Sequence, residues 1–110
     1  MSLGLDKTAL VLNISSIEKG FYKSLNMSEF NSQAKQLMMV TSEVVEVMEA
    51  LRKDKGEQEV MDELADIVIR VLDFYQAIKD AGVVSQSLDE AVIKKHEKNL
   101  TRPHMHGVKG

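Results

Sequence analysis

Two pairs of carboxylates with helical spacing are the residues of this sequence best suited to chemistry. Glu43 and Glu46 are three residues apart, and Glu63 and Asp66 have the same spacing further along. Side chains three apart on a helix have Cβ atoms about 5–6 Å apart, so each pair can hold one cation or one edge of a two-ion site. On antiparallel neighbouring helices the two pairs would form one box of four carboxylates. Ligands that are all oxygen suit Mg²⁺, with Mn²⁺ as an alternative.

Each pair also has an interpretation that needs no metal. Glu43 and Glu46 lie away from the apolar side of their segment, which is typical of a solvated helix face. Arg70 is about one turn from both Asp66 and Asp73, so it would neutralise them in a row of ion pairs. A di-iron bundle requires Glu-x-x-His on two helices, and no histidine of this chain has a glutamate three residues before it.

The second pair lies in an unusually apolar segment. Between Leu64 and Ile78 the only polar residues are Asp66, Arg70, Asp73 and Gln76. A helix that is apolar on nearly every side is predicted to be buried, and charges inside it need partners or a metal. Glu59 continues the same acidic line toward solvent, where we interpret it as a surface charge.

Apolar spacing of three and four predicts an all-α fold, a bundle of about four helices. The first helix is expected from Leu5 to Ser24, with Asp6 as its N-cap and Gly20 as a residue that weakens or ends it. The second is expected to begin from an N-cap at Asn26 or Ser28.

The third helix is expected over Glu57–Lys79. The fourth begins at a capping box of Ser87 and Glu90 and ends near Leu100. Because a helix cannot continue through Pro103, we expect residues 101–110 to be an extended C-terminal segment. The second helix also carries a seam with the alternating spacing that helices use to pack on one another, formed by Phe30, Ala34, Leu37, Thr41, Val44, Met48 and Leu51.

Positive charge gathers near the C-terminal end. The apolar stripe of the fourth helix is continued by Lys95 and Asn99, which is unexpected for a side that faces a core. Beside a carboxylate-bound cation, such a basic segment would suit a polyphosphate substrate. The alternative is a solvated, frayed end without a function. The cationic residues and histidines concerned are Lys94, Lys95, Lys98, Arg102, Lys109, His96, His104 and His106.

Composition narrows the class of protein. A chain of 110 residues with 44% hydrophobic residues is predicted to form one domain over residues 1–110. The net charge of −3 argues against nucleic acid as a partner. The chain has no cysteine, which excludes disulfides, thiolate zinc sites and cysteine nucleophiles. No apolar run is long enough for a membrane span, so we expect a cytoplasmic protein without a membrane partner.

Four motifs, in this order, resemble the MazG-like, all-α nucleoside triphosphate pyrophosphohydrolases. They are Lys19-Gly-Phe-Tyr22, Ser42-Glu-Val-Val-Glu-Val-Met-Glu-Ala-Leu-Arg52, Glu63-Leu-Ala-Asp66 and Lys95-x-x-x-Asn99-x-x-Arg102-Pro-x-x-His106-Gly. The resemblance extends from about Ile17 to Lys109. It implies a homodimer or a homotetramer built as a dimer of dimers. It also implies Mg²⁺-dependent cleavage of a (d)NTP to a (d)NMP and diphosphate, a hydrolysis of a phosphoric anhydride bond that clears nucleotide pools.

The resemblance also assigns residues. Glu43, Glu46, Glu63 and Asp66 are similar to the metal ligands of the family. Phosphate and sugar contacts are implied for Lys95, Asn99, Arg102, His106 and Lys109. Ser42 stands where the family often has a further glutamate. The general base is therefore open between Glu46 and Glu43, and the metal itself is an alternative means of activating water.

Two questions stay open at the level of the sequence. Tyr22, with Phe21, either helps to form the base pocket or is an ordinary core aromatic at a helix end. The competing functions are a non-catalytic helical module that associates with itself through the Phe30–Leu51 seam, and a sensor that binds nucleotide without hydrolysing it.

Overall fold

The structure, a computed structural model, describes residues 1–102, and residues 103–110 lie outside the described part. Its helices are α1 (Leu5–Glu18), α2 (Phe30–Arg52), α3 (Glu57–Asp80) and α4 (Leu88–Leu100). Residues 1–102 contain no strand. The prediction of an all-α chain with four helices is confirmed. None of these helices has the length and apolar character needed to cross a membrane, as judged over the described residues.

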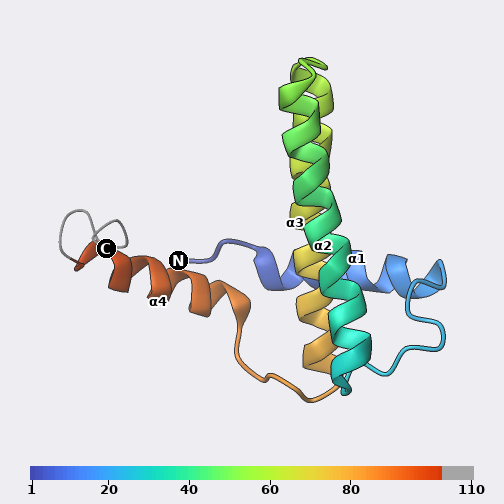
Figure 1. Ribbon diagram of the computed structural model, residues 1–110. Coiled ribbons are helices and arrows are strands. Elements are labelled where there is room, and N and C mark those ends of the chain that lie inside the picture. Colours follow the sequence, from blue (N-terminus) through green and yellow to red (C-terminus); the bar gives the residue numbers. More distant parts are fainter. Residues whose placement is uncertain (103–110) are drawn as a thin grey trace.

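The long antiparallel pair of α2 and α3 forms the centre of the molecule (Figure 1). The turn between them is tight because Asp54 and Gly56 adopt positive φ angles of 51° and 99°. In Figure 1, α1 crosses the pair and packs on α3, whereas α4 extends away from both long helices. Within one chain, the bundle thus consists of three helices.

Two helix ends agree with local signals in the sequence, namely the C-terminal end of α1 and the N-terminal end of α4. Gly20 follows α1 with a φ of 82°, and the N–H of Phe21 donates to the carbonyl of Ser16, so α1 ends at Glu18 rather than Ser24. The Ser87 hydroxyl accepts a hydrogen bond from the N–H of Glu90 at 3.2 Å, which confirms the predicted cap of α4.

Two predicted caps are wrong. The residue that precedes α1 is Gly4, which has no side chain to act as a cap, and Asp6 instead binds the first turn of α4. The second helix begins at Phe30, later than predicted, and no side chain caps it. Asn26 accepts from the N–H of Ser28 and so shapes the turn before the helix. The candidate capping side chain is used elsewhere in each case. Asp6 contacts a segment that is distant in the sequence, and Asn26 stabilises a local turn.

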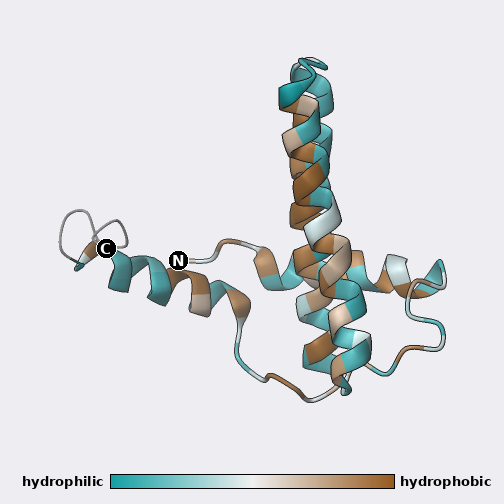
Figure 2. Ribbon diagram, in the orientation of Figure 1, coloured by the Kyte–Doolittle hydropathy of each residue, from teal (hydrophilic) through white to brown (hydrophobic). Residues whose placement is uncertain are grey.

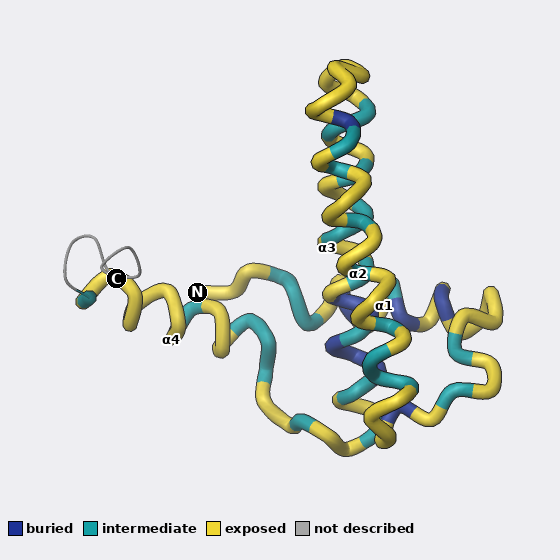
Figure 3. The backbone as a smooth tube through the Cα atoms, in the orientation of Figure 1, coloured by how far each residue is buried: buried dark blue, intermediate teal, exposed yellow. Residues whose placement is uncertain are grey.

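The core lies where α1 crosses the C-terminal half of α3, and Figure 3 shows that most buried residues gather there. Ala9, Leu72 and Tyr75 form its centre, with Leu5, Leu12, Val84 and Leu88 packed against them. One polar pair is buried with this core. The Asn13 amide donates to the Asp73 carboxylate at 2.8 Å, and the two residues are 2% and 4% exposed.

Within one chain, α3 is not buried on nearly every side, so the predicted burial of this helix would need a second copy and stays a prediction. Its N-terminal half has large exposed residues, such as Leu64 at 42% and Val68 at 53%. The Phe30–Leu51 seam of α2 is also largely exposed, with Met48 at 61%. The reason is geometric, because α3 packs on a different side of α2, where Ala50 is buried. Figure 2 shows the apolar residues that follow α2 along its length.

Candidate metal centre

Three carboxylates meet between α2 and α3. Glu43 comes from α2, and Glu63 and Asp66 come from one side of α3. One carboxylate oxygen from each lies within 4.8 Å of the others. The antiparallel pairing of the helices brings Glu43 opposite the other two, and the three-residue spacing keeps Glu63 and Asp66 adjacent. All three residues are half-buried, so this cluster is accessible without being fully solvated.

The electrostatics of this cluster are unfavourable without a cation. The pKa of Glu63 is raised, first by loss of solvent and then by the negative charges of the surrounding carboxylates, Glu43, Glu46, Asp66 and Glu59. Like charges held this close disfavour ionisation, and a divalent cation would remove that cost. The donors are all carboxylate oxygens, which fit a hard cation such as Mg²⁺ or Mn²⁺.

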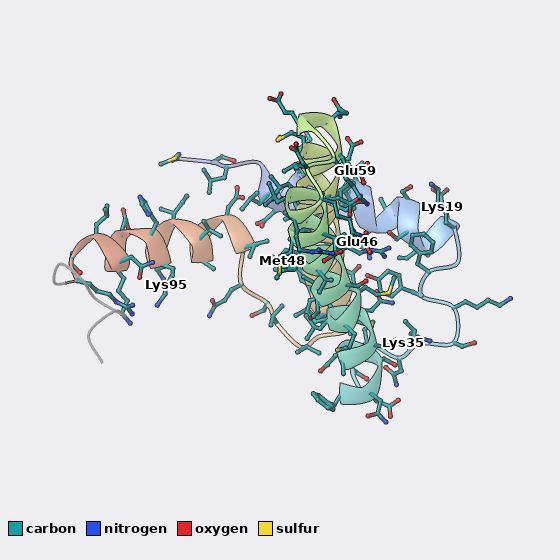
Figure 4. All side chains as sticks on the ribbon, turned by 45° about the horizontal axis from the view of Figure 1, so that its top comes forward. Lys19, Lys35, Glu46, Met48, Glu59 and Lys95 are labelled. Carbon is teal, nitrogen blue, oxygen red and sulfur yellow. The ribbon has the colours of Figure 1, made fainter. Side chains whose placement is uncertain are left out.

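Glu46 lies next to the three-carboxylate cluster but is not part of it. Its side chain is on the exposed side of α2 (Figure 4), yet its charge is close enough to raise the pKa of Glu63. The four carboxylates proposed as a box are thus arranged as three that converge and one beside them.

Arg70 contacts the cluster differently from the expected row of ion pairs. Its Nε atom lies 3.8 Å from Oε1 of Glu43, and its guanidinium lies over the Phe21 ring at 5.8 Å. Asp73, the other expected partner, is held by Asn13 instead. Arg70 therefore links an aromatic residue that follows α1 to a carboxylate of the candidate metal centre. Sequence spacing within one helix gives no signal for these contacts, which come from other elements.

A small hollow of about 160 Å³ adjoins Arg70. It is lined by Phe21, Lys35, Gln36, Met39 and Arg70. The sequence offered no reason to select Lys35 or Gln36, because isolated polar residues on a helix are common. The hollow combines an aromatic ring, an amide and two cations beside the carboxylate cluster, a composition that suits an organic anion.

Tyr22 lies close to the buried Asn13–Asp73 pair. Its hydroxyl is buried and makes no hydrogen bond of ordinary geometry among the described residues, although the side chains of Asp73 and Asn13 lie beside it. The pKa of this hydroxyl is raised, chiefly by burial and next by the negative charge of Asp73 beside it. Tyr22 therefore lies at the edge of the core. This position agrees better with a core aromatic at a helix end than with a residue that lines an open pocket.

The structure does not bring the basic residues of α4 to the carboxylates of the same chain. Lys95 and Asn99 are exposed on α4, where they line a shallow groove with Ala91, Val92 and His96. Figure 4 shows Lys95 well away from Glu46. Arg102 is half-buried just beyond α4, whereas the predicted contacts His106 and Lys109 lie outside the described residues. A single chain therefore does not bring Lys95 and Asn99 to the carboxylates, and their contacts with phosphate stay a prediction.

Converging carboxylates on two antiparallel helices offer the oxygen ligands that a hard cation prefers. The model of the MazG nucleotide pyrophosphohydrolase domain matches residues 31–106. The chain belongs to this family, and at that level it is a hydrolase. The match includes all carboxylates of the candidate centre and all of α4, and it leaves α1 outside. No curated protein and no solved structure matches the chain significantly.

Proposed function

We propose that this protein is a Mg²⁺-dependent nucleoside triphosphate pyrophosphohydrolase, with Mn²⁺ as an alternative cation. It would convert a (d)NTP and water to a (d)NMP and diphosphate and so clear nucleotides from the cellular pool. The observation that carries the proposal is the convergence of Glu43, Glu63 and Asp66 within the matched domain. A half-buried cluster of like charges suits a cation that also binds phosphates.

Glu43, Glu63 and Asp66 would hold the cation, with Glu46 at the edge of the site. When bound, Mg²⁺ would neutralise the phosphate oxygens and favour departure of the leaving group. Glu46 is the better candidate for the general base, because Glu43 already faces Arg70 and the other two carboxylates. Its carboxylate would take a proton from water as the water oxygen bonds to the α-phosphorus. The bond from that phosphorus to the bridging oxygen breaks, and diphosphate leaves.

The substrate would extend from the carboxylates toward cations of α4. We assign phosphate and sugar contacts to Lys95, Asn99 and Arg102, and with them His106 and Lys109. The hollow beside Arg70 suits the base. Tyr22 follows Phe21 of this hollow in the chain, and we assign it a supporting role in base binding. Arg and Lys donors recognise phosphate oxygens through charge-assisted hydrogen bonds.

These contacts require a second copy of the chain, because α4 does not reach its own acidic cluster (Figure 4). The exposed apolar residues of α2 and of the N-terminal half of α3 support the same conclusion. We therefore propose a homodimer or homotetramer in which α4 of one copy serves the carboxylates of another. A solvent-exposed apolar seam with helix-packing spacing is typical of such an interface.

Identification of the products tests the reaction. Purified protein with Mg²⁺ and a panel of ribo- and deoxyribonucleoside triphosphates is expected to release diphosphate and a monophosphate from at least one substrate. Orthophosphate as the first product would contradict the proposal, and so would the absence of turnover across the panel.

Mixing two variants that are each impaired at substrate concentrations below KM tests the contribution of α4 from a second copy. Glu63→Gln removes a carboxylate and Lys95→Ala removes a phosphate contact. Mixed oligomers contain some sites with both groups intact if Lys95 acts across the interface, so activity returns on mixing. If Lys95 acts within its own chain, mixed oligomers formed after dissociation and reassociation regain no activity.

A second candidate function is a helical module that associates with itself without catalysis, because the exposed seam of α2 favours self-association. Under this alternative Mg²⁺ and EDTA leave the thermal stability unchanged and nucleotides do not bind. A nucleotide sensor would bind triphosphate without turnover. Calorimetric titration with Mg²⁺ and nucleotide, run beside the product assay, separates the three.

A further inference from the structure

Asp6 of α1 and Asp89 of α4 cap each other's helices, because each carboxylate accepts hydrogen bonds from N–H groups at the start of the other helix. The Asp89 carboxylate accepts hydrogen bonds from the N–H groups of Leu3, Gly4 and Leu5, at 3.2, 3.2 and 2.7 Å. It also accepts from the Ser2 hydroxyl at 3.2 Å. In return, the Asp6 carboxylate accepts from the N–H groups of Leu88 and Asp89 at 2.9 and 3.1 Å, and from the Ser87 hydroxyl. We call these two residues the Asp6–Asp89 pair.

This exchange satisfies several of the free N–H groups that every helix has at its N-terminus, namely those of Leu5 in α1 and of Leu88 and Asp89 in α4. Gly4 offers no side chain to cap α1, so the carboxylate from α4 fills that role. Each negative charge also lies at the positive end of the partner helix dipole, which favours the arrangement further. Each carboxylate thus stabilises the start of the other helix, and the exchange fixes the two helix starts relative to each other.

The direction of α4 depends on this small region. No residue of α4 is buried, and α4 packs on α1 rather than on the central pair. Tyr75 makes further contacts near its start, because its hydroxyl donates to the carbonyl of Gln86 at 2.7 Å and accepts from the N–H of Leu88 at 3.2 Å. Leu88 also packs partly on the core. Among the described residues, everything beyond the first turn of α4 is exposed or half-exposed.

We propose that Asp6 and Asp89 are positioning residues that set the direction of α4 and so deliver Lys95 and Asn99 to the phosphates of the substrate. The inference rests on the proposed function, in which α4 contributes to the site of a second copy. Neither residue touches the substrate. Their role is to hold a helix that is otherwise attached at one end.

The ionisation of Asp6 supports this role. Its pKa is lowered, chiefly by the hydrogen bond from Ser87, with further contributions from the N–H groups of Asp89 and Leu88 and from the positive charge of Lys79, against the opposing effect of desolvation. The carboxylate is therefore charged at neutral pH, where it is the stronger acceptor.

Spin labels measure the direction of α4 without any assay of activity. The chain has no cysteine, so cysteines introduced at the exposed positions Ser15 on α1 and Lys98 on α4 are labelled uniquely. Labelled protein is diluted with unlabelled protein so that distances within one chain dominate. We expect a narrow distance distribution in the parent and a broad one after Asp6→Ala or Asp89→Ala. Asp6→Asn keeps an acceptor oxygen and is expected to restore part of the order, and it serves if an alanine variant does not fold.

The kinetic readout separates positioning from a general loss of structure. We expect Asp6→Ala and Asp89→Ala to raise KM for the triphosphate about tenfold, the effect of losing one charge-assisted phosphate contact, with kcat and Mg²⁺ affinity changed less than about threefold. Glu90→Gln is the matched control, because it removes a charge from the same turn of α4 but not from the Asp6–Asp89 pair.

Three results would overturn the proposal. The first is an unchanged narrow distance distribution in both alanine variants. The second is a loosened α4 with an unchanged KM, and the third is an equal effect in Glu90→Gln. If the parent protein releases no diphosphate, the proposed function fails and the delivery of Lys95 and Asn99 fails with it. The spin-label distances then still decide whether the Asp6–Asp89 pair holds α4.

Discussion

Both halves of α3 contain apolar residues and carboxylates, but the surroundings of the two halves differ. In the C-terminal half, α1 packs on buried residues such as Leu72 and Tyr75, and the one buried carboxylate, Asp73, receives a hydrogen bond from Asn13. In the N-terminal half, Met61, Leu64 and Val68 are exposed, and Glu63 and Asp66 converge with a third carboxylate. The C-terminal half thus finds its packing and hydrogen-bond partners within the chain. The N-terminal half lacks both an apolar cover and enough positive charge to balance its carboxylates. Exposed apolar residues and unbalanced negative charge therefore occur together in the N-terminal half, where a second copy and a cation would bind.

Removal of a carboxylate from the N-terminal half of α3 is expected to have the largest effect on activity. Glu63→Gln should lower the release of diphosphate on the order of 100-fold or more, because an amide cannot supply the negative charge that a cation needs. It should not destabilise the cation-free protein, because it relieves the like charges that raise the pKa of Glu63. Product assays and Mg²⁺ titrations measure both effects. Asp62→Asn, a neighbouring exposed carboxylate bonded only to Gln58 among the contacts seen, is the control. Substantial activity in Glu63→Gln would contradict the assignment.

A charge placed on the exposed seam of α2 tests the missing apolar cover. Met48→Glu should weaken self-association on the order of 100-fold, because an unpaired carboxylate would be desolvated in the interface. Sedimentation measured over a range of concentrations reports the change. Gln58→Glu adds the same charge at a polar position of α3 and should leave assembly unaltered. A parent protein that is monomeric at micromolar concentration would refute the interface itself.

A third prediction concerns the C-terminal half of α3, where Asn13 binds Asp73. Asp73→Ala leaves the buried Asn13 amide without its carboxylate acceptor, which should lower the free energy of unfolding by roughly 1–3 kcal/mol. Denaturant titration measures the loss, and Asp62→Ala should change it by no more than about 0.5 kcal/mol. Mg²⁺ affinity should stay within about twofold of the parent. If Mg²⁺ binding were lost while stability was retained, the contrast between the two halves would be wrong.

The smallest expected effect is at Tyr22, at the edge of the same core. Its hydroxyl is buried and makes no hydrogen bond of ordinary geometry in the described part of the chain, so Tyr22→Phe should leave stability unchanged or raise it by up to about 1 kcal/mol. Thermal unfolding gives the change in stability, and KM for the triphosphate reports any contact with substrate. A loss of more than about 1 kcal/mol would show that the hydroxyl has a partner in solution.

Helical periodicity predicted the four helices, because apolar spacing and local caps such as Ser87 depend on residues close together in the sequence. The same pattern also predicted the pairs of carboxylates, but it did not predict which side of each helix finds a partner. For this reason α3 was expected to be buried throughout, although α1 covers only part of it. Contacts between distant segments, such as Asp6 with Leu88 or Arg70 with Phe21, leave no mark on spacing within one element.

The large sequence separation between the two residues of the Asp6–Asp89 pair also affects the order of folding. Its hydrogen bonds join residues 81 to 87 positions apart, whereas α2 and α3 meet across the short turn at residues 53–56. Closing the longer loop costs more chain entropy and yields few contacts in return. The α2–α3 hairpin, with its carboxylates, should therefore form early, and α4 should be the last helix fixed in place and the first released on partial unfolding.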